Sequence, residues 1–257
     1  MVGRDLIKTS EIRAQISQIE EFKTAVSTFQ VKYGYLPGDM PPSQASQLGF
    51  FTFTGAAAGL GCVTEEKAFG NNDGSINFYT EMYPFWSHLS DAKLLKGSYG
   101  GIAGDLLSTT ATTCASTGGQ PIIGGGGYAG AIKFFPPSKM ASDVGIVRAV
   151  GNYFGAPNRV TTPAVYSNTQ RVNMFQVMNY INTNDTFSAY EMYQIDSKID
   201  DGLPALGDVR DYYTGDYGTG TPSSDPPCTT GSGSSLTYRL SAATSNTRRC
   251  NSIMFLF

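Results

Sequence analysis

The chain has 257 residues, of which 40% are hydrophobic and 15% are charged, and its formal net charge is −3. This apolar content is enough to bury a core, which excludes wholesale disorder. The near-neutral charge excludes a global basic field of the kind that attracts nucleic acid. Low charge combined with 30 glycines and 15 tyrosines is typical of an extracytoplasmic β-rich protein.

The first predicted element is a long amphipathic helix over residues 4–33, a stretch without proline or glycine. Its apolar residues recur in steps of three and four, which predicts one buried face. That core face consists of Ile12, Ile16, Ile19, Phe22, Val26 and Phe29. The opposite side carries Glu11, Arg13, Gln15, Gln18, Glu21 and Lys32. Leu6 and Ile7 fall outside the stripe, so the helix becomes apolar on other sides toward residue 1.

Gly34 and Pro37-Gly38 end this helix. A second amphipathic helix is predicted over 80–96. A third is predicted over 188–199, where Ser188 and Glu191 match the S-x-x-E capping box. Alternating or short apolar runs between turn residues predict strands. These runs cover 131–136, 145–150, 171–178, 235–240 and 253–257.

A helix followed by antiparallel strands predicts the α+β class, with one domain over 1–257. Within it, we expect the N-terminal helix at 4–33, a helix-to-sheet region at 34–130, and the sheet with a C-terminal disulfide region at 131–257.

The four cysteines, Cys62, Cys114, Cys228 and Cys250, are widely spaced and form no C-x-x-C pair. Structural zinc sites bring their ligands in close pairs, so an even number of distant cysteines favours two disulfides over a metal centre. Free buried thiols are the alternative. Three connectivities are open from the spacing alone.

The sequence shows no recognisable set of catalytic residues. The single histidine, His88, lies inside a predicted helix, and no G-x-S-x-G elbow accompanies it. We therefore expect a structural histidine and a non-catalytic protein.

The string 71–76, Asn-Asn-Asp-Gly-Ser-Ile, is similar to the middle of a calcium-binding loop. A plain turn is the alternative, because Phe69 occupies the first ligand position and has no side-chain oxygen. If a cation binds, we expect Ca²⁺ held through Asn71 and Asp73, with Asp200 and Asp201 as the next candidates. No other cofactor is expected.

Residues 29–40, Phe-Gln-Val-Lys-Tyr-Gly-Tyr-Leu-Pro-Gly-Asp-Met, resemble the end of the first helix in type IV pilin-like proteins, the pilins and pseudopilins. The strings 85–89, 136–140 and 195–204 are similar to larger prepilin-like members, and Cys228 and Cys250 resemble the pilin disulfide loop. The resemblance, together with proximity in sequence, implies pairing of Cys228 with Cys250 and of Cys62 with Cys114. It also implies a long helix packed on an antiparallel sheet.

The resemblance implies a structural subunit of a type IV pilus or of a type II secretion pseudopilus. In such a filament, Leu6, Ile7, Glu11, Arg13, Gln18 and Glu21 would form the assembly face. The prepilin peptidase site and the apolar N-terminal half-helix of the family are absent, and we expect both to have been removed. That half-helix would anchor the subunit in the inner membrane before assembly. The mature filament would then lie at the cell surface or in the periplasm. The alternative function is a minor tip pilin whose loops, with Tyr212, Tyr213 and Tyr217, bind a glycan or DNA.

Overall fold

The computed structural model describes about half of the chain with defined placement. The described residues are 2–50, 70–76, 81–100, 131–140, 145–151, 173–179, 186–204, 206–211, 228–230, 237–241, 248–250 and 252–257.

Helices dominate the N-terminal half of the described chain and short strands dominate the rest. The helices are α1 (Val2–Tyr33), α2 (Pro42–Gln47), α3 (Met82–Asp91) and α6 (Ala189–Ile199). The strands are β1 (Gly145–Gly151), β2 (Asn173–Asn179), β3 (Phe187–Ser188), β4 (Val209–Asp211), β5 (Thr229–Thr230), β6 (Thr237–Tyr238), β7 (Arg248–Cys250) and β8 (Ser252–Leu256).

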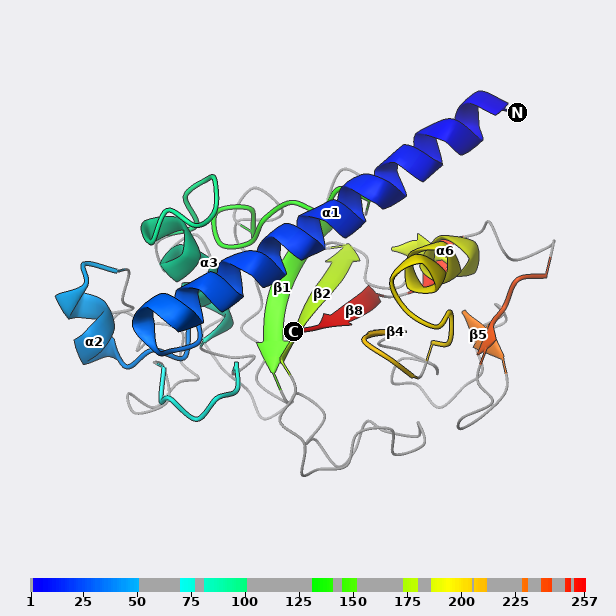
Figure 1. Cartoon of the computed structure of the whole chain (residues 1–257). Coiled ribbons are helices and arrows are strands. Elements are labelled where there is room, and N and C mark those ends of the chain that lie inside the picture. The colour runs from blue at the N-terminus through cyan, green and yellow to red at the C-terminus, as the bar shows by residue number, and fades with distance from the viewer. Residues whose placement is uncertain are drawn as a thin grey trace, which may run out of the picture. The chain divides into compact units, whose positions relative to one another are not determined.

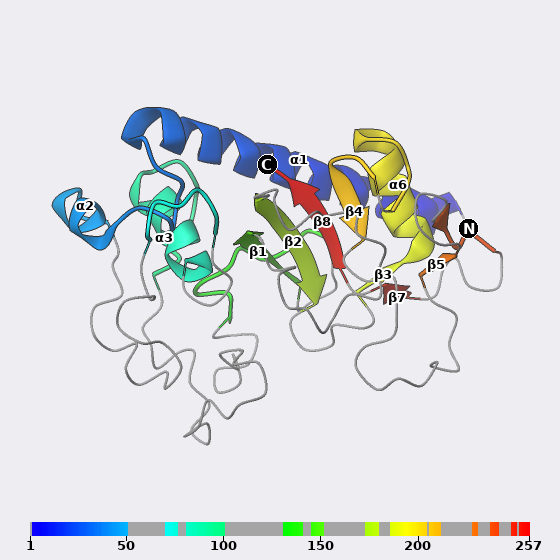
Figure 2. The same ribbon diagram turned by 90° about the horizontal axis from the view of Figure 1, so that it is seen from below.

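The main sheet has the order β1-β2-β8-β4. Figure 1 shows β1, β2 and β8 side by side, and Figure 2 shows β4 next to β8. β8 pairs antiparallel with both of its neighbours, so that Phe255 lies opposite Phe175 on β2 and Val209 on β4. Two further antiparallel pairs, β3-β7 and β5-β6, form small separate ladders. The α+β class with an N-terminal helix and an antiparallel sheet is therefore confirmed.

The chain divides into two compact units. One comprises Met1–Glu20, Ser138–Val147 and Tyr153–Phe257, and the other comprises Glu21–Pro137 and Arg148–Asn152. Both α1 and β1 contribute residues to each unit.

Helix α1 ends where the sequence predicts. Gly34 has a φ of +77°, a left-handed conformation that glycine adopts without steric cost, and its N–H donates to the Gln30 carbonyl at 2.8 Å. The last turn of the helix is thereby closed. Gly38 has a φ of +82° and turns the chain again after Pro37.

The second unit has an aromatic core. Phe22 on α1 meets Trp86 on α3 at a ring-centroid distance of 4.7 Å, and Tyr83 contacts Phe134 at 5.7 Å. Trp86, Phe85 and Phe134 are fully buried. Large rings stabilise such a core through their buried area and through edge-to-face contacts.

Helix α6 begins with the predicted capping box. The Ser188 hydroxyl accepts from the Glu191 N–H at 3.2 Å, and the Glu191 carboxylate accepts from the Ser188 N–H at 2.8 Å. Both groups are buried, so each bond satisfies a backbone amide that the first turn of a helix leaves without a partner.

Two predicted elements differ from the structure. The strand expected over 131–136 is a tight turn, because the N–H groups of Phe134 and Phe135 both donate to the Ala131 carbonyl. The helix expected to run to residue 96 ends at Asp91, and Lys93 follows in a left-handed conformation with a φ of +59°. Phe134, Phe135 and Leu95 are buried in these segments, whereas Ile132 is exposed. In both places local backbone hydrogen bonds determine the conformation.

Candidate functional sites

The predicted core face of α1 is largely buried. Ile12, Ile19, Phe22, Val26 and Phe29 have exposed fractions of 4% or less, and Ile16 is half-buried. Leu6 and Ile7, which precede this face, are 65% and 61% exposed. Val31, near the other end of α1, is 90% exposed but stands alone, whereas Leu6 and Ile7 form an adjacent pair of exposed aliphatic side chains at the start of the helix.

The expected assembly face is only partly on the surface. Arg13 and Glu21 are exposed and Glu11 is half-buried. The prediction for Gln18 was wrong, because its side chain is buried, and Gln15 on the same expected polar side is also fully buried.

A hydrogen-bonded network explains why Gln15 is inside. Its Oε1 accepts from the Ser138 hydroxyl at 2.8 Å and from the Lys139 N–H at 2.9 Å, while its Nε2 donates to Gln18 at 3.1 Å. A buried amide is tolerated when its donors and acceptors have partners. The periodicity of α1 alone could not reveal partners that are more than 120 residues away in the chain.

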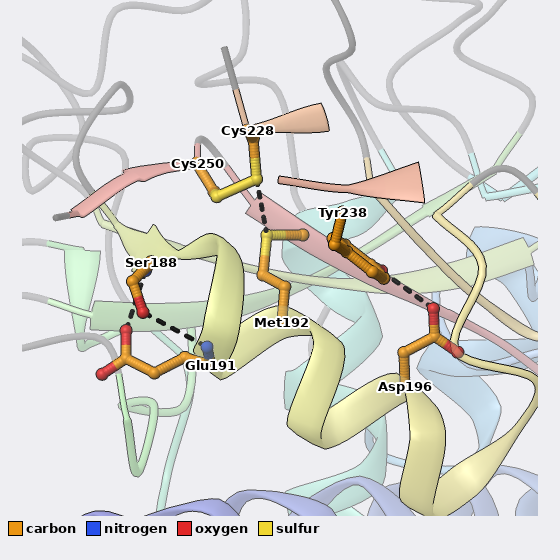
Figure 3. Close-up of a disulfide and its surroundings, with 7 residues drawn as sticks. All are labelled: Ser188, Glu191, Met192, Asp196, Cys228, Tyr238 and Cys250. Atoms are coloured by element: carbon orange, nitrogen blue, oxygen red, sulfur yellow. Dashed lines mark hydrogen bonds between the residues drawn. A yellow bond between two sulfur atoms is a disulfide. The ribbon is translucent and has the colours of Figure 1, made fainter. Parts of the chain in front are cut away.

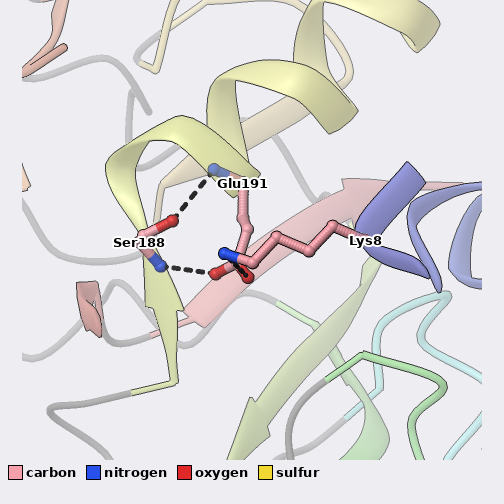
Figure 4. Close-up of polar contacts among 3 residues, drawn as sticks. All are labelled: Lys8, Ser188 and Glu191. Atoms are coloured by element: carbon pink, nitrogen blue, oxygen red, sulfur yellow. Dashed lines mark hydrogen bonds and ion pairs between the residues drawn. The ribbon is translucent and has the colours of Figure 1, made fainter. Parts of the chain in front are cut away.

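A second polar contact connects α1 with α6. The Lys8 ammonium lies 3.3 Å from Oε1 of Glu191, and Figure 4 shows the Lys8 side chain reaching toward the α6 capping box. The Lys8 side chain is 42% exposed, whereas that of Glu191 is 2% exposed. The capping carboxylate therefore also serves as one partner of an ion pair.

The C-terminal disulfide lies against α6. Cys228 and Cys250 are bonded, with Cα atoms 5.2 Å apart, which confirms this predicted pair. The Cys228 sulfur lies 3.7 Å from the Met192 sulfur, a van der Waals contact because the bonded sulfur carries no proton (Figure 3). Cys62 and Cys114 lie outside the described residues, so their pairing stays a prediction.

An acidic cluster lies at the end of α6. Carboxylate oxygens of Asp196, Asp200 and Asp201 lie within 4.8 Å of one another, the one such group of three metal-ligating side chains among the described residues. Asp196 is fully buried and accepts from the Tyr238 hydroxyl at 2.8 Å and from the Gly202 N–H at 3.0 Å. The structure thus brings Asp200 and Asp201 together with Asp196, a third carboxyl that is not among the calcium ligands expected from the sequence.

Burial is the main electrostatic influence on this cluster. It raises the pKa of Asp196 to about 7, because the charged form loses its hydration, and the neighbouring Asp201 and Asp200 carboxylates raise it further. The hydrogen bonds from Tyr238 and Gly202 act in the opposite direction. Burial likewise raises the pKa of Tyr238. Asp200 accepts hydrogen bonds from the N–H groups of Asp208 and Val209. Asp201 accepts one from the N–H of Leu203.

The other predicted calcium site is a turn that surrounds a carboxylate. Asp39 is buried, and its two oxygens accept from the N–H groups of Asp73 and Gly74 at 3.2 and 2.8 Å. Asn71 Oδ1 accepts from the Asp73 N–H and Asp73 Oδ1 from the Ser75 N–H, both at 2.9 Å. This is an anion-binding arrangement of successive amides that the protein fills with its own side chain. The side-chain oxygens of Asn71 and Asp73 are therefore engaged within the turn.

His88 occupies a core position. It is 2% exposed, its ring stacks on Phe29 with centroids 6.1 Å apart, and its Nδ1 accepts from the Gly38 N–H at 3.0 Å. This placement fits the structural role expected from the sequence.

Comparisons with known proteins identified no related protein. No family model matches the chain, and searches of curated proteins and of solved structures found no significant match. Among the described residues, no helix is long and apolar enough to cross a membrane. Tyr212, Tyr213 and Tyr217, expected in an alternative binding role, lie outside the described residues.

Proposed function

We propose that the chain is a non-catalytic structural subunit of a filament of the type IV pilin-like class, a type IV pilus or a type II secretion pseudopilus. The proposal is carried by one observation, the change of surface along α1. Ile12 to Phe29 bury one face of the helix, whereas Leu6 and Ile7 are largely exposed. A 32-residue helix with this asymmetry suits an element that is held in its own globule at one end and packs on other subunits at the other.

Two further features support the proposal. An antiparallel sheet follows the N-terminal helix, and the Cys228–Cys250 disulfide stabilises the C-terminal region, as the resemblance in sequence implies. Asp39 and Gly38, which carry that resemblance at the end of the helix, have defined structural roles in the turn that follows α1.

The partners in this proposal are other copies of the chain and related subunits. As the resemblance implies, an apolar half-helix at the N-terminus of such a subunit would hold it in the inner membrane and then pack in the filament core. The filament itself would be extracytoplasmic. Leu6 and Ile7 alone offer far less area than the roughly 1,200–2,000 Å² that a stable interface buries, so the 257-residue chain should be a monomer or at most a weak oligomer. Analytical ultracentrifugation checks this expectation.

Charge reversal on the exposed side of α1 tests the assembly function. We expect Arg13→Glu to impair the formation of filaments seen by electron microscopy while leaving the melting temperature within about 2 °C. Lys96→Glu is the matched control, since Lys96 is exposed in the other unit. Normal filaments in the Arg13→Glu strain, or their equal loss in the control strain, would count against the proposal.

A further inference from the structure

The contact between Lys8 and Glu191 joins two segments that are distant in sequence. Lys8 follows directly after the exposed Leu6 and Ile7, and its ammonium meets Oε1 of Glu191 at 3.3 Å (Figure 4). Glu191 is almost completely buried. A buried carboxylate needs a charge partner and hydrogen bonds to offset its lost hydration, so removing the ammonium weakens the support of the whole group.

Glu191 is also part of the structure that starts α6. Its Oε2 accepts from the Ser188 N–H at 2.8 Å, and its own N–H donates to the Ser188 hydroxyl at 3.2 Å. A shift of the carboxylate toward solvent would therefore disturb the Ser188 N–H bond and loosen the first turn of α6.

Ser188 connects the start of α6 with the strand pair that contains Cys250. It belongs to β3, which pairs antiparallel with β7, where Phe187 lies opposite Cys250. The Thr186 N–H donates to the Cys250 carbonyl at 3.0 Å. Met192, the residue that follows Glu191 on α6, contacts the Cys228 sulfur, so both cysteines of the disulfide contact the segment 186–192 (Figure 3). Figure 2 shows α6, β3 and β7 grouped together.

We infer that the Lys8–Glu191 ion pair is a clamp that couples the start of α1 to the disulfide region through the capping box of α6. Opening of the first turns of α1 and opening of the first turn of α6 are then one linked event. The clamp regulates the candidate assembly surface, because it fixes the helix that presents Leu6 and Ile7. This last consequence rests on the proposed function, whereas the coupling itself does not.

Amide hydrogen exchange on the isolated 257-residue chain tests the clamp. We expect Lys8→Gln to speed exchange about tenfold in two segments, 8–12 on α1 and 188–192 at the start of α6. We expect a smaller acceleration of exchange than the loss of a fully buried ion pair would cause, because the Lys8 side chain is partly exposed to solvent. Lys8→Arg, which keeps the charge, should exchange at rates close to those of the unmodified chain. Arg13→Gln, on an exposed position of the same helix, should change neither segment.

A double-mutant comparison separates coupling from a local effect. Glu191→Gln keeps an oxygen for the Ser188 N–H but removes the charge. We expect the Lys8→Gln/Glu191→Gln protein to exchange no faster than the faster single variant. Additive acceleration, or acceleration confined to one of the two segments, would overturn the clamp. If Glu191→Gln does not fold, the comparison of Lys8→Gln with Lys8→Arg decides alone. Because no filament is involved, a negative result here is distinguishable from a failure of the proposed assembly function.

Discussion

The N–H of Gly38 donates a hydrogen bond to Nδ1 of His88 at 3.0 Å, which fixes the turn after α1 to the middle of α3. The approach of the two segments leaves no room for a side chain at Gly38. A Cβ atom there would lie 2.3 Å from the Glu81 carbonyl oxygen, and the φ of +82° is unfavourable for any other residue.

Substitution of Gly38 should therefore be far more harmful than that of another left-handed glycine. We expect Gly38→Ala to lower the free energy of unfolding by about 3 kcal/mol or more, since both strain and a backbone clash arise. Gly34→Ala is the matched control. Its φ is +77°, but its Cβ would meet nothing within 4 Å, so a loss of about 1 kcal/mol is expected. Urea denaturation measures both variants. If Gly38→Ala and Gly34→Ala lost the same free energy of unfolding, the backbone contact at Gly38 would not be tight.

The sequence predicted those elements whose signals are local. The stripe of α1, its end at Gly34 and the capping box of Ser188 and Glu191 all depend on residues a few positions apart. The Cys228–Cys250 pair was also predicted, from the resemblance and the short separation.

Distant partners were the part that could not be predicted. Burial of Gln15 depends on Ser138, and the role of Asp39 depends on the amides of Asp73 and Gly74. The Lys8–Glu191 pair likewise joins two segments that are distant in the sequence. In each case a polar residue is satisfied by a group whose position only the tertiary fold determines, and periodicity carries no information about it.

Asp196 should make the stability of the chain fall as the pH rises. Its folded-state pKa of about 7 lies above the ordinary value of 3.8, so the folded chain holds a proton that the unfolded chain releases. The stabilisation is complete below pH 4 and is lost as the pH rises to about 7, by up to about 4 kcal/mol. Urea denaturation of the unmodified chain and of Asp196→Asn across this range measures the contribution.

The variant Asp196→Asn should remove most of this slope, because the amide does not titrate. Tyr238→Phe should instead shift the transition to higher pH, since the Tyr238 hydroxyl donates to Asp196 and lowers its pKa. A slope that is unchanged in Asp196→Asn would assign the pH dependence to another group.

Ile19 tests the assignment of the buried face of α1. It is 2% exposed, so Ile19→Asp would place an unpaired carboxylate in the core and should unfold the chain at 25 °C. Ser17→Asp, two residues earlier on an exposed position, should change the melting temperature by only about 2 °C. Circular dichroism melting curves decide the matter, and a fully stable Ile19→Asp chain would show that this face is not the core.

Calcium binding can be tested at both candidate positions. If a cation binds, we expect millimolar Ca²⁺ to raise the melting temperature and a chelator to reverse the effect, through fixation of a loop. Loss of the effect in Asp201→Asn would place the ion beside Asp196 and Asp200, whereas loss in Asp73→Asn would place it in the 71–75 turn. A melting temperature insensitive to both Ca²⁺ and chelator would contradict any such site.

Site-specific photo-cross-linking in the cell tests the proposed filament most directly. A benzophenone amino acid replaces Leu6 on the exposed start of α1, and a second strain carries it at Ser46 on α2, which is also exposed. If subunits assemble through this helix, illumination of the Leu6 strain gives a ladder of covalent multiples of the subunit in the filament fraction, and the Ser46 strain gives markedly fewer. Only monomers in the Leu6 strain, with the protein folded and present at normal levels, would contradict assembly through this helix.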